Sequence, residues 1–249
     1  MENLFERYEL QGINYAKSAY TITSDAQVDE ATNTITVSLE NEFPVADIRY
    51  ALNDAPLDET ATPYTKPIEI NSTTTIKASL YEDDKPVGKV FEKTFNYHKA
   101  VGKKVIYNNM YSDSYQGKGA GNMVNIVRGT KNFHDGQWQA WIAKDMELTI
   151  DLEEETEISN VSVGTMESQG PSIYFPTEVE VLVSNDGKSF TSVGKIDRPY
   201  KNNPGITLKD FSIDFDTQKV RFVKVKAKRY NRTDRKGGVW IFVDEIIVR

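Results

Sequence analysis

Thr34-Ile35-Thr36-Val37-Ser38-Leu39 alternates strictly between polar and apolar residues. Successive side chains of a β-strand point to opposite faces, so this stretch predicts a strand with Ile35, Val37 and Leu39 on one buried face. Further strands are predicted at 47–52, 73–81 and 89–97. Turn residues separate them at Asn53-Asp54 and at Asp83-Asp84-Lys85-Pro86. Short strands at this spacing indicate an immunoglobulin-like or fibronectin-like sandwich.

The period-two pattern returns in the second half of the chain. It predicts strands at 147–152, 158–164, 178–184, 189–194, 209–215, 220–227 and 239–248. A long irregular stretch at 108–143 precedes them and is rich in Gly, Asn, Tyr and Trp. Long structured loops of a compact sandwich are usually where binding occurs. We therefore expect a second, jelly-roll-like β-sandwich with its binding residues on loops.

The polar segment 98–104 separates the two patterns and is the predicted domain boundary, with His98 expected to be solvated. A helical pattern at 2–11 ends before Gly12. Two interpretations of it stay open: the trailing helix of an upstream domain, or a short terminal helix packed on the first sandwich. The predicted organisation is an all-β chain with a short N-terminal helix: 1–19 as an upstream remnant, 20–100 as an immunoglobulin-like domain and 101–249 as a jelly roll.

Composition excludes several classes of function. The net charge of −7 argues against nucleic acid as the main partner, because phosphate binding needs a basic face. The absence of cysteine removes disulfides and thiolate chemistry. No apolar run has the length of a membrane span, and no signal peptide is visible, so we expect the sequence to start inside a longer protein.

Catalytic patterns are weak. His98 and His134 are the two histidines, and neither lies in a setting typical of a nucleophilic triad. The acidic run at 151–157 suits a solvated strand end and turn better than a catalytic carboxylate pair. Glycines 117, 119 and 121 precede no strand–helix unit that could hold a nucleotide. Oxygen ligands for calcium could come from Asp135, Asp244 and Glu245, but roles in turns and at the sandwich edge are favoured for these acids.

Three loop segments combine aromatic and polar residues: 133–138, 167–174 and 230–236. Sugars stack their C–H faces on aromatic rings, and their hydroxyls pair with carboxamides and forked donors. The candidate carbohydrate-binding residues are His134, Gln137, Gln169, Tyr174, Tyr230, Arg232 and Arg235. Four of them have an alternative role: Tyr174 and Tyr230 are as compatible with burial as with exposure, and Arg232 and Arg235 can serve simply to keep the strand end soluble. Trp138, Trp141 and Trp240 are expected to pack in the core or at loop bases.

Residues 103–249 resemble the coagulation factor 5/8 C-terminal (discoidin) domain, a fold shared by family 32 carbohydrate-binding modules. The landmarks are Gly136-Gln137-Trp138-Gln139, Leu148-Thr149-Ile150-Asp151-Leu152, Ser184-Asn185-Asp186-Gly187, Val220-Arg221-Phe222-Val223-Lys224-Val225 and Trp240-Ile241-Phe242-Val243-Asp244-Glu245-Ile246. The resemblance implies sugar binding at the three loops. Ile126-Val127-Arg128-Gly129 departs from relatives that carry an acid before the glycine, so Arg128 would repel a calcium ion. Glu245 matches a position that contributes to structural calcium in some relatives, so calcium stays an option; otherwise no cofactor is expected.

Residues 20–97 resemble the β-sandwich that follows the barrel in bacterial chitobiases and β-hexosaminidases. The cues are Ile48-Arg49-Tyr50-Ala51-Leu52, Pro56, Tyr64-Thr65-Lys66-Pro67 and Thr75-Ile76-Lys77-Ala78; Asn53-Asp54 departs from the usual Asp-Gly. Glu9-Leu10-Gln11-Gly12-Ile13-Asn14-Tyr15 resembles the segment leaving a family 20 glycoside hydrolase barrel.

Together these resemblances imply the non-catalytic C-terminal modules of a secreted β-N-acetylhexosaminidase, in the periplasm, at the cell surface or outside the cell. The second module would bind glycans containing galactose or N-acetylhexosamine. The implied partners are a glycan and the upstream catalytic domain, in a monomer that neither binds nucleic acid nor inserts into a membrane. The alternatives are purely structural modules that pack on the barrel or bind a protein partner, and an intact enzyme, for which we find no catalytic residues.

Overall fold

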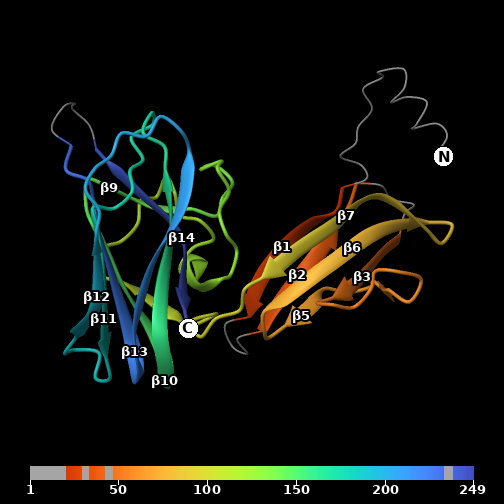
Figure 1. Cartoon of the computed structure of the whole chain (residues 1–249), viewed down its shortest axis with the longest axis horizontal. Helices are drawn as coiled ribbons and strands as arrows, with labels where there is room; N and C mark the ends of the chain where they lie inside the picture. Colours follow the sequence, from red (N-terminus) through yellow and green to blue (C-terminus); the bar gives the residue numbers. More distant parts are fainter. Residues whose placement is uncertain (1–20, 30–33, 43–46, 233–237) are drawn as a thin grey trace. The chain divides into compact units, whose positions relative to one another are not determined.

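A computed structural model describes residues 21–29, 34–42, 47–232 and 238–249. The predicted all-β class is confirmed (Figure 1). The helix predicted at 2–11 lies outside the described residues. Contacts divide the chain into two compact units, one built around residues 36–95 and the other around residues 96–249. Among the described residues, no helix has the length and apolar character needed to cross a membrane.

The first unit contains two sheets. One has the order β1 (Thr23–Asp29), β2 (Thr34–Glu40), β5 (Ile68–Ile70). The other has the order β4 (Thr62–Pro63), β3 (Asp47–Leu52), β6 (Thr74–Glu82), β7 (Lys85–Phe95). The alternation that predicted β2 is confirmed, because Ile35, Val37 and Leu39 are buried there.

The hairpin between β6 and β7 shows how the sequence sets this fold. Glu82 pairs with Lys85, and the two residues between them, Asp83 and Asp84, have φ of 48° and 61°. Positive φ at both positions is the geometry of a type I′ turn, which short acidic side chains tolerate. Pro86 lies within β7, the edge strand of its sheet, where a missing N–H donor is tolerated.

The second unit is one sheet folded into two layers (Figure 1). Its strand order is β12 (Thr191–Asp197), β11 (Glu178–Ser184), β13 (Thr207–Lys228), β10 (Met146–Glu167), β14 (Trp240–Val248), β9 (Gln139–Ile142). β8 (Lys104–Tyr107) also pairs with β10, and a 3-10 turn, η2, spans Asn122–Val124.

The sequence predicted two strands where β10 runs unbroken, and two more where β13 does. Both predictions are wrong, because the two strands pair along their whole length and absorb the polar residues between the predicted segments as bulges. The register shifts between Asp151 and Thr156, and Glu153 there has a φ of 72°. β10 and β13 form a long two-stranded ribbon. At one half of it, β13 pairs with β11 and β10 pairs with β8; at the other half, β10 pairs with β14. The two long strands therefore belong to both layers.

Two apolar clusters fill the second unit. The main core includes Ile241 and Val243 from β14. Phe242 lies between them in sequence, points to the opposite face, and packs in a smaller cluster with Trp138 and Ile173. Trp138 and Trp141 are fully buried, as predicted, and Trp240 packs against the smaller cluster.

The predicted solvation of His98 is wrong: the residue is 4% exposed. The backbone of Lys99 donates to the Val248 carbonyl at 2.9 Å, which places this polar segment against β14. The His98 Nε2 atom lies 2.9 Å from Glu245 Oε1, and its Nδ1 accepts from the Ala100 N–H at 3.3 Å. Nδ1 is therefore the acceptor nitrogen, and Nε2 carries the proton toward Glu245.

Candidate functional site

The loops at the start of β14 are joined by backbone hydrogen bonds. Trp240 N donates to the Ser172 carbonyl at 3.0 Å, and Tyr174 N donates to the Trp240 carbonyl at 3.1 Å. Thr177 N donates to the Lys228 carbonyl at 2.8 Å. These bonds hold the segment 172–177 next to the end of β13 and the start of β14, at one end of the sandwich.

Three tyrosines meet at this end and are called here the tyrosine group: Tyr174, Tyr200 and Tyr230. The rings of Tyr200 and Tyr230 are stacked, with centroids 4.6 Å apart and planes 14° apart. Tyr174 packs on Tyr230 with centroids 5.1 Å apart. Tyr174 is 7% exposed, whereas Tyr200 is 43% exposed. Tyr200 therefore presents an exposed aromatic ring, stacked on the half-buried Tyr230, which in turn packs on the buried Tyr174.

Polar groups lie along the edge of the tyrosine group. Arg232 Nη1 donates to Ser172 Oγ at 2.9 Å and to the Tyr174 hydroxyl at 3.4 Å. The Tyr200 hydroxyl donates to Gln169 Oε1 at 3.4 Å, and Gln169 Nε2 donates to the Lys201 carbonyl at 2.8 Å. An aromatic surface edged by a guanidinium and a carboxamide suits a ligand with both apolar faces and hydroxyl groups.

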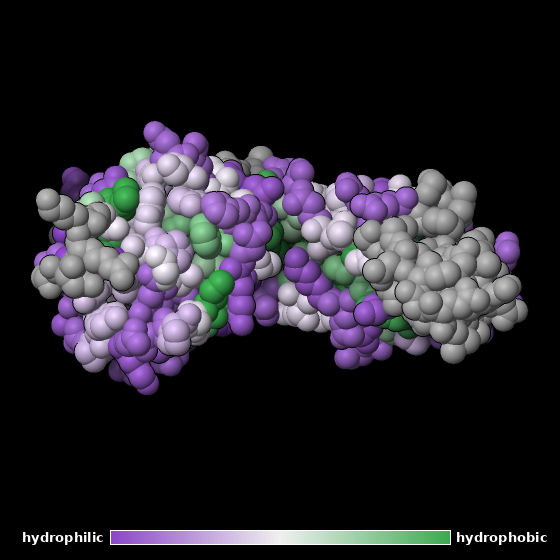
Figure 2. Space-filling view, turned by 90° about the horizontal axis from the view of Figure 1, so that it is seen from above, coloured by the Kyte–Doolittle hydropathy of each residue, from purple (hydrophilic) through white to green (hydrophobic). Residues whose placement is uncertain are grey.

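A buried carboxylate fixes the loop that carries Tyr200. Glu167, fully buried at the end of β10, accepts from Asn203 Nδ2 at 3.1 Å and lies 3.5 Å from Arg198 Nη2. Arg198 also lies over the Phe175 ring, 4.9 Å from its centroid. The segment 198–203 is thereby attached to the sandwich on both sides of Tyr200. Tyr200, Ile206 and Leu208 are exposed large hydrophobic side chains within the segment 200–208, whereas hydrophilic residues cover much of the face in Figure 2.

A second set of rings, the Tyr115 group, gathers over Phe242: Tyr115, Phe133, His134 and Trp240. Tyr115 lies 4.6 Å from Phe242 and 5.3 Å from Trp240, centroid to centroid. The exposed His134 ring lies 4.2 Å from Phe133 and 5.9 Å from Tyr115. This group covers the outer face of β14, so it is built on the smaller apolar cluster.

The structure thus divides the candidate residues. It brings Gln169, Tyr174, Tyr230 and Arg232 together, and it places His134 in the Tyr115 group. Gln137 is half-buried, and its Oε1 atom has no hydrogen-bond partner. Arg235 lies outside the described residues.

Tyr200 was missed from the sequence. Its segment, Arg198-Pro199-Tyr200-Lys201, carries an aromatic between polar residues as the three chosen loops do. That composition could have singled it out.

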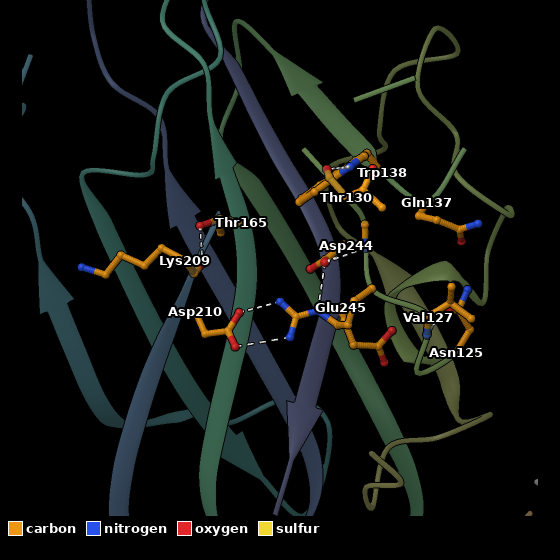
Figure 3. A network of polar contacts seen from close by, with 12 residues as sticks. Asn125, Val127, Thr130, Gln137, Trp138, Thr165, Lys209, Asp210, Asp244 and Glu245 are labelled. Carbon is orange, nitrogen blue, oxygen red and sulfur yellow. Dashed lines mark hydrogen bonds and ion pairs between the residues drawn. The ribbon is translucent and has the colours of Figure 1, made fainter. Parts of the chain in front are cut away.

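A separate polar network is centred on Asp244 of β14 (Figure 3). Its Oδ2 accepts from Arg128 Nε and from the Gly129 N–H, each at 2.9 Å. The far side of the Arg128 guanidinium donates to both carboxylate oxygens of Asp210, at 2.5 and 3.3 Å. Burial raises the pKa of Asp244, and the adjacent Arg128 opposes that rise. Burial opposes the charge of Arg128, but the hydrogen bonds to Asp210 and the charge of Asp244 raise its pKa above the ordinary value.

Glu245 and its surroundings do not fit calcium. Burial raises the pKa of Glu245 well above its ordinary value, and its Oε1 atom lies 2.9 Å from His98 Nε2. Its hydrogen-bond partner is thus a ring nitrogen, whereas calcium requires several oxygen ligands. Figure 3 shows the carboxyl groups of Asp244 and Glu245 on different sides of β14, so they share no site. Within the described part of the chain, no three His, Asp or Glu side chains gather as metal ligands.

Comparisons with known proteins agree with this architecture. Residues 108–241 match the family model described as F5/8 type C domain, and residues 37–95 match the model described as Fn3 associated. No curated protein matches the chain.

Several solved structures are similar to the second unit. Chitosan-binding module 2 from a Paenibacillus sp. IK-5 chitosanase/glucanase, solved with chitotriose, shares 20% identity over 60% of this chain and 98% of that one, with a TM-score of 0.39. CpGH89CBM32-5 from Clostridium perfringens, solved with GalNAc-β-1,3-galactose, shares 18% identity over 58% and 93%, with a TM-score of 0.37. The lectin domain of lectinolysin, complexed with Lewis B antigen, shares 15% over 61% and 95%, with a TM-score of 0.43.

The family match spans more than half of the chain and coincides with the folded sheet, its loops and most of β14. The chain therefore belongs to the F5/8 type C (discoidin-like) domain family.

Proposed function

We propose that the second unit, residues 101–249, is a non-catalytic glycan-binding module whose contact surface is the tyrosine group. One observation carries the proposal: the exposed ring of Tyr200, stacked on Tyr230, belongs to a group of tyrosines that Arg232 and Gln169 contact at its edge. A pyranose offers an apolar C–H face to such rings and hydroxyls to the groups at their edge. Family membership supports the fold, and the arrangement of these side chains supports the ligand.

The proposed ligand is a glycan containing galactose or N-acetylhexosamine. The axial hydroxyl of galactose leaves one ring face apolar, which suits stacking on Tyr200. An N-acetyl group adds a methyl for the same aromatic surface and an amide for hydrogen bonding with Gln169 or Arg232. Such contacts at an open surface favour weak binding of one or two sugar units.

We further propose that the two units are C-terminal modules of a secreted β-N-acetylhexosaminidase, with domains at 20–100 and 101–249. The support is the resemblance of residues 20–97 to the sandwich that follows chitobiase barrels. A weakly binding module attached to a hydrolase raises the effective concentration of substrate near the catalytic domain. A monomer in the periplasm, at the cell surface or outside the cell fits this role.

The test is a titration of the whole chain with galactose, N-acetylgalactosamine, N-acetylglucosamine and chitotriose, monitored by NMR or calorimetry. Tyr200→Ala should weaken binding at least about fivefold, since stacking on one aromatic ring contributes about 1 kcal/mol or more. His134→Ala is the matched control, because His134 is an exposed ring of the Tyr115 group. Binding that survives Tyr200→Ala but is lost in His134→Ala would move the site to the Tyr115 group. No binding of any glycan by the folded chain would contradict the proposal.

A purely structural role is the second candidate, and the burial of Tyr174 favours it. Tyr174 is 7% exposed, and its hydroxyl accepts from Arg232, so part of the tyrosine group ties two loops together. If the tyrosine group serves only to hold these two loops together, Arg232→Ala should lower the melting temperature, and no glycan should bind to the unmodified chain. In a binding module, Arg232→Ala should lower glycan affinity as well.

A further inference from the structure

The turn 125–129 is held in an unfavourable backbone conformation. Ile126 has a φ of 62°, in the left-handed region that β-branched residues avoid, and it is buried. Such strain persists only where the surroundings hold it in place. Asp244 of β14 holds the end of the turn, because its Oδ2 atom accepts from the Gly129 N–H at 2.9 Å.

Arg128 provides the positive charge that makes the Asp244 contact possible. The Asp244 side chain is 1% exposed, and a buried carboxylate is stable only when paired and hydrogen-bonded. Arg128 Nε lies 2.9 Å from Asp244, and the same guanidinium is bidentate to Asp210 at the start of β13. One side chain of the turn thus neutralises a carboxylate on β14 and binds another on β13.

The sandwich leaves space for this arrangement. A Cβ atom added to Gly164 of β10 would lie 2.1 Å from Asp244 Oδ1 and 2.4 Å from Arg128 Nη2. A Cβ added to Gly129 would lie 2.3 Å from the Trp138 ring. Trp138 Nε1 in turn donates to the Thr130 carbonyl at 3.1 Å. The absence of side chains at two glycines therefore lets the turn approach the sheet closely.

We propose that Arg128 acts as a built-in cation: its guanidinium, clamped between Asp244 and Asp210, holds the strained 125–129 turn and the following 130–138 loop without any divalent metal ion. The loop that carries Phe133 and His134 is positioned by this clamp. Asp135 closes the loop itself, because its Oδ2 accepts from the Thr130 N–H at 2.6 Å. The proposal does not depend on glycan binding by the tyrosine group.

The first experiment measures thermal unfolding of the whole chain in excess EDTA and in millimolar calcium chloride. The melting temperature should be the same in both, because Arg128 already supplies the charge that a metal would provide. A saturable rise in melting temperature with calcium would overturn the proposal.

The second experiment compares Arg128→Gln, Arg128→Lys and Asp210→Asn by thermal unfolding and by hydrogen exchange at the Gly129 amide. Arg128→Gln should give the largest fall in melting temperature, of the order of 5–10 °C, and the fastest exchange, since it leaves Asp244 buried without a cation. Arg128→Lys should give an intermediate melting temperature and exchange rate, because an ammonium keeps the charge but cannot donate to Asp244 and Asp210 at once as the guanidinium does. Asp210→Asn should change little, since Asp210 is 45% exposed.

A double variant separates the clamp from simple loss of packing. Arg128→Gln with Asp244→Asn should melt above Arg128→Gln alone, because the second change removes the uncompensated charge. Melting no higher than that of Arg128→Gln would contradict the clamp, as would unchanged Gly129 exchange in Arg128→Gln. If Arg128→Gln does not fold, the Gly129 exchange rate in Arg128→Lys decides: a rate equal to that of the unmodified chain overturns the proposal.

Discussion

Asp244 and Glu245 are neighbours on β14, are buried to the same degree, and are accommodated in opposite ways. Asp244 faces a guanidinium and keeps its charge through the ion pair with Arg128. Glu245 faces the neutral ring of His98, and burial favours the uncharged form of both partners. The comparison shows that a carboxyl group tolerates burial either by pairing with a permanent cation or by keeping its proton.

The difference follows from the alternation of the strand. One side of β14 meets the turn that carries Arg128, and the other meets the segment at His98. Asp244 holds the Gly129 end of the turn that contains the strained Ile126, whereas Glu245 is hydrogen-bonded to His98. The two acids should therefore respond differently to neutralisation and to pH.

Asp244→Asn should cause the larger loss on this strand, about 2–4 kcal/mol of unfolding free energy. The half-buried Arg128 would keep only its ion pair with the more exposed Asp210. The Gly129 N–H would have to share a neutral amide oxygen with Arg128, and that oxygen is a weaker acceptor than the carboxylate. Urea unfolding monitored by tryptophan fluorescence measures the change. A loss under about 0.5 kcal/mol would mean that the two acids are equivalent after all.

His98→Gln should cost about 1–3 kcal/mol near neutral pH, since it disturbs a buried hydrogen bond to Glu245. The cost should depend on pH. Burial lowers the pKa of His98 to about 3 in the folded protein, against about 6.5 when unfolded. The unfolded chain binds the extra proton between these values, so the stability contributed by neutral His98 is full above about pH 6.5 and is lost as the pH falls toward 3.

Urea unfolding of both proteins from pH 4 to 8 tests this dependence. The difference between unmodified chain and His98→Gln should shrink steadily as the pH falls. A difference that stays constant would mean that His98 is not held neutral by burial.

Glu245→Gln should have the smallest effect, within about 1 kcal/mol, because an amide replaces a carboxyl group that burial keeps protonated. The sign with pH is opposite to that of His98. Folding raises the pKa of Glu245, so its contribution is present below the unfolded value of about 4.5 and is lost as the pH rises through the folded value. Relative to the unmodified chain, the variant should therefore gain stability as the pH rises. A cost as large as that of Asp244→Asn at every pH would show that Glu245 is ionised.

Local pattern was enough to predict the strands but not their continuity. Ile35, Val37 and Leu39 are buried as their alternation requires, and β3 and β11 have the predicted bounds. β10 was divided in two because Glu153–Glu155 resemble a turn, yet a bulge keeps these exposed residues in the strand. Whether a polar stretch interrupts a strand or bulges out of it depends on the partner strand, here β13.

The candidate site was predictable in composition rather than in grouping. The segments 167–174 and 230–232 do meet, because Tyr174 and Tyr230 pack together. The separate place of His134 depends on which face of β14 each loop covers, and no local signal gives that. His98 was assigned to solvent from its polar surroundings, whereas its partner Glu245 is 147 positions away.

The two ends of the second unit lie next to each other, because Lys99 N donates to the Val248 carbonyl at 2.9 Å. Trp240, at the other end of β14, lies eight residues earlier, or ~26 Å along the strand. A unit of this kind can be spliced into a surface loop of an unrelated scaffold, or circularly permuted by joining the adjacent ends. In either arrangement the end of the sandwich that carries the aromatic rings would lie opposite the point of attachment and stay accessible. The unit could therefore be transferred to other proteins without covering these rings.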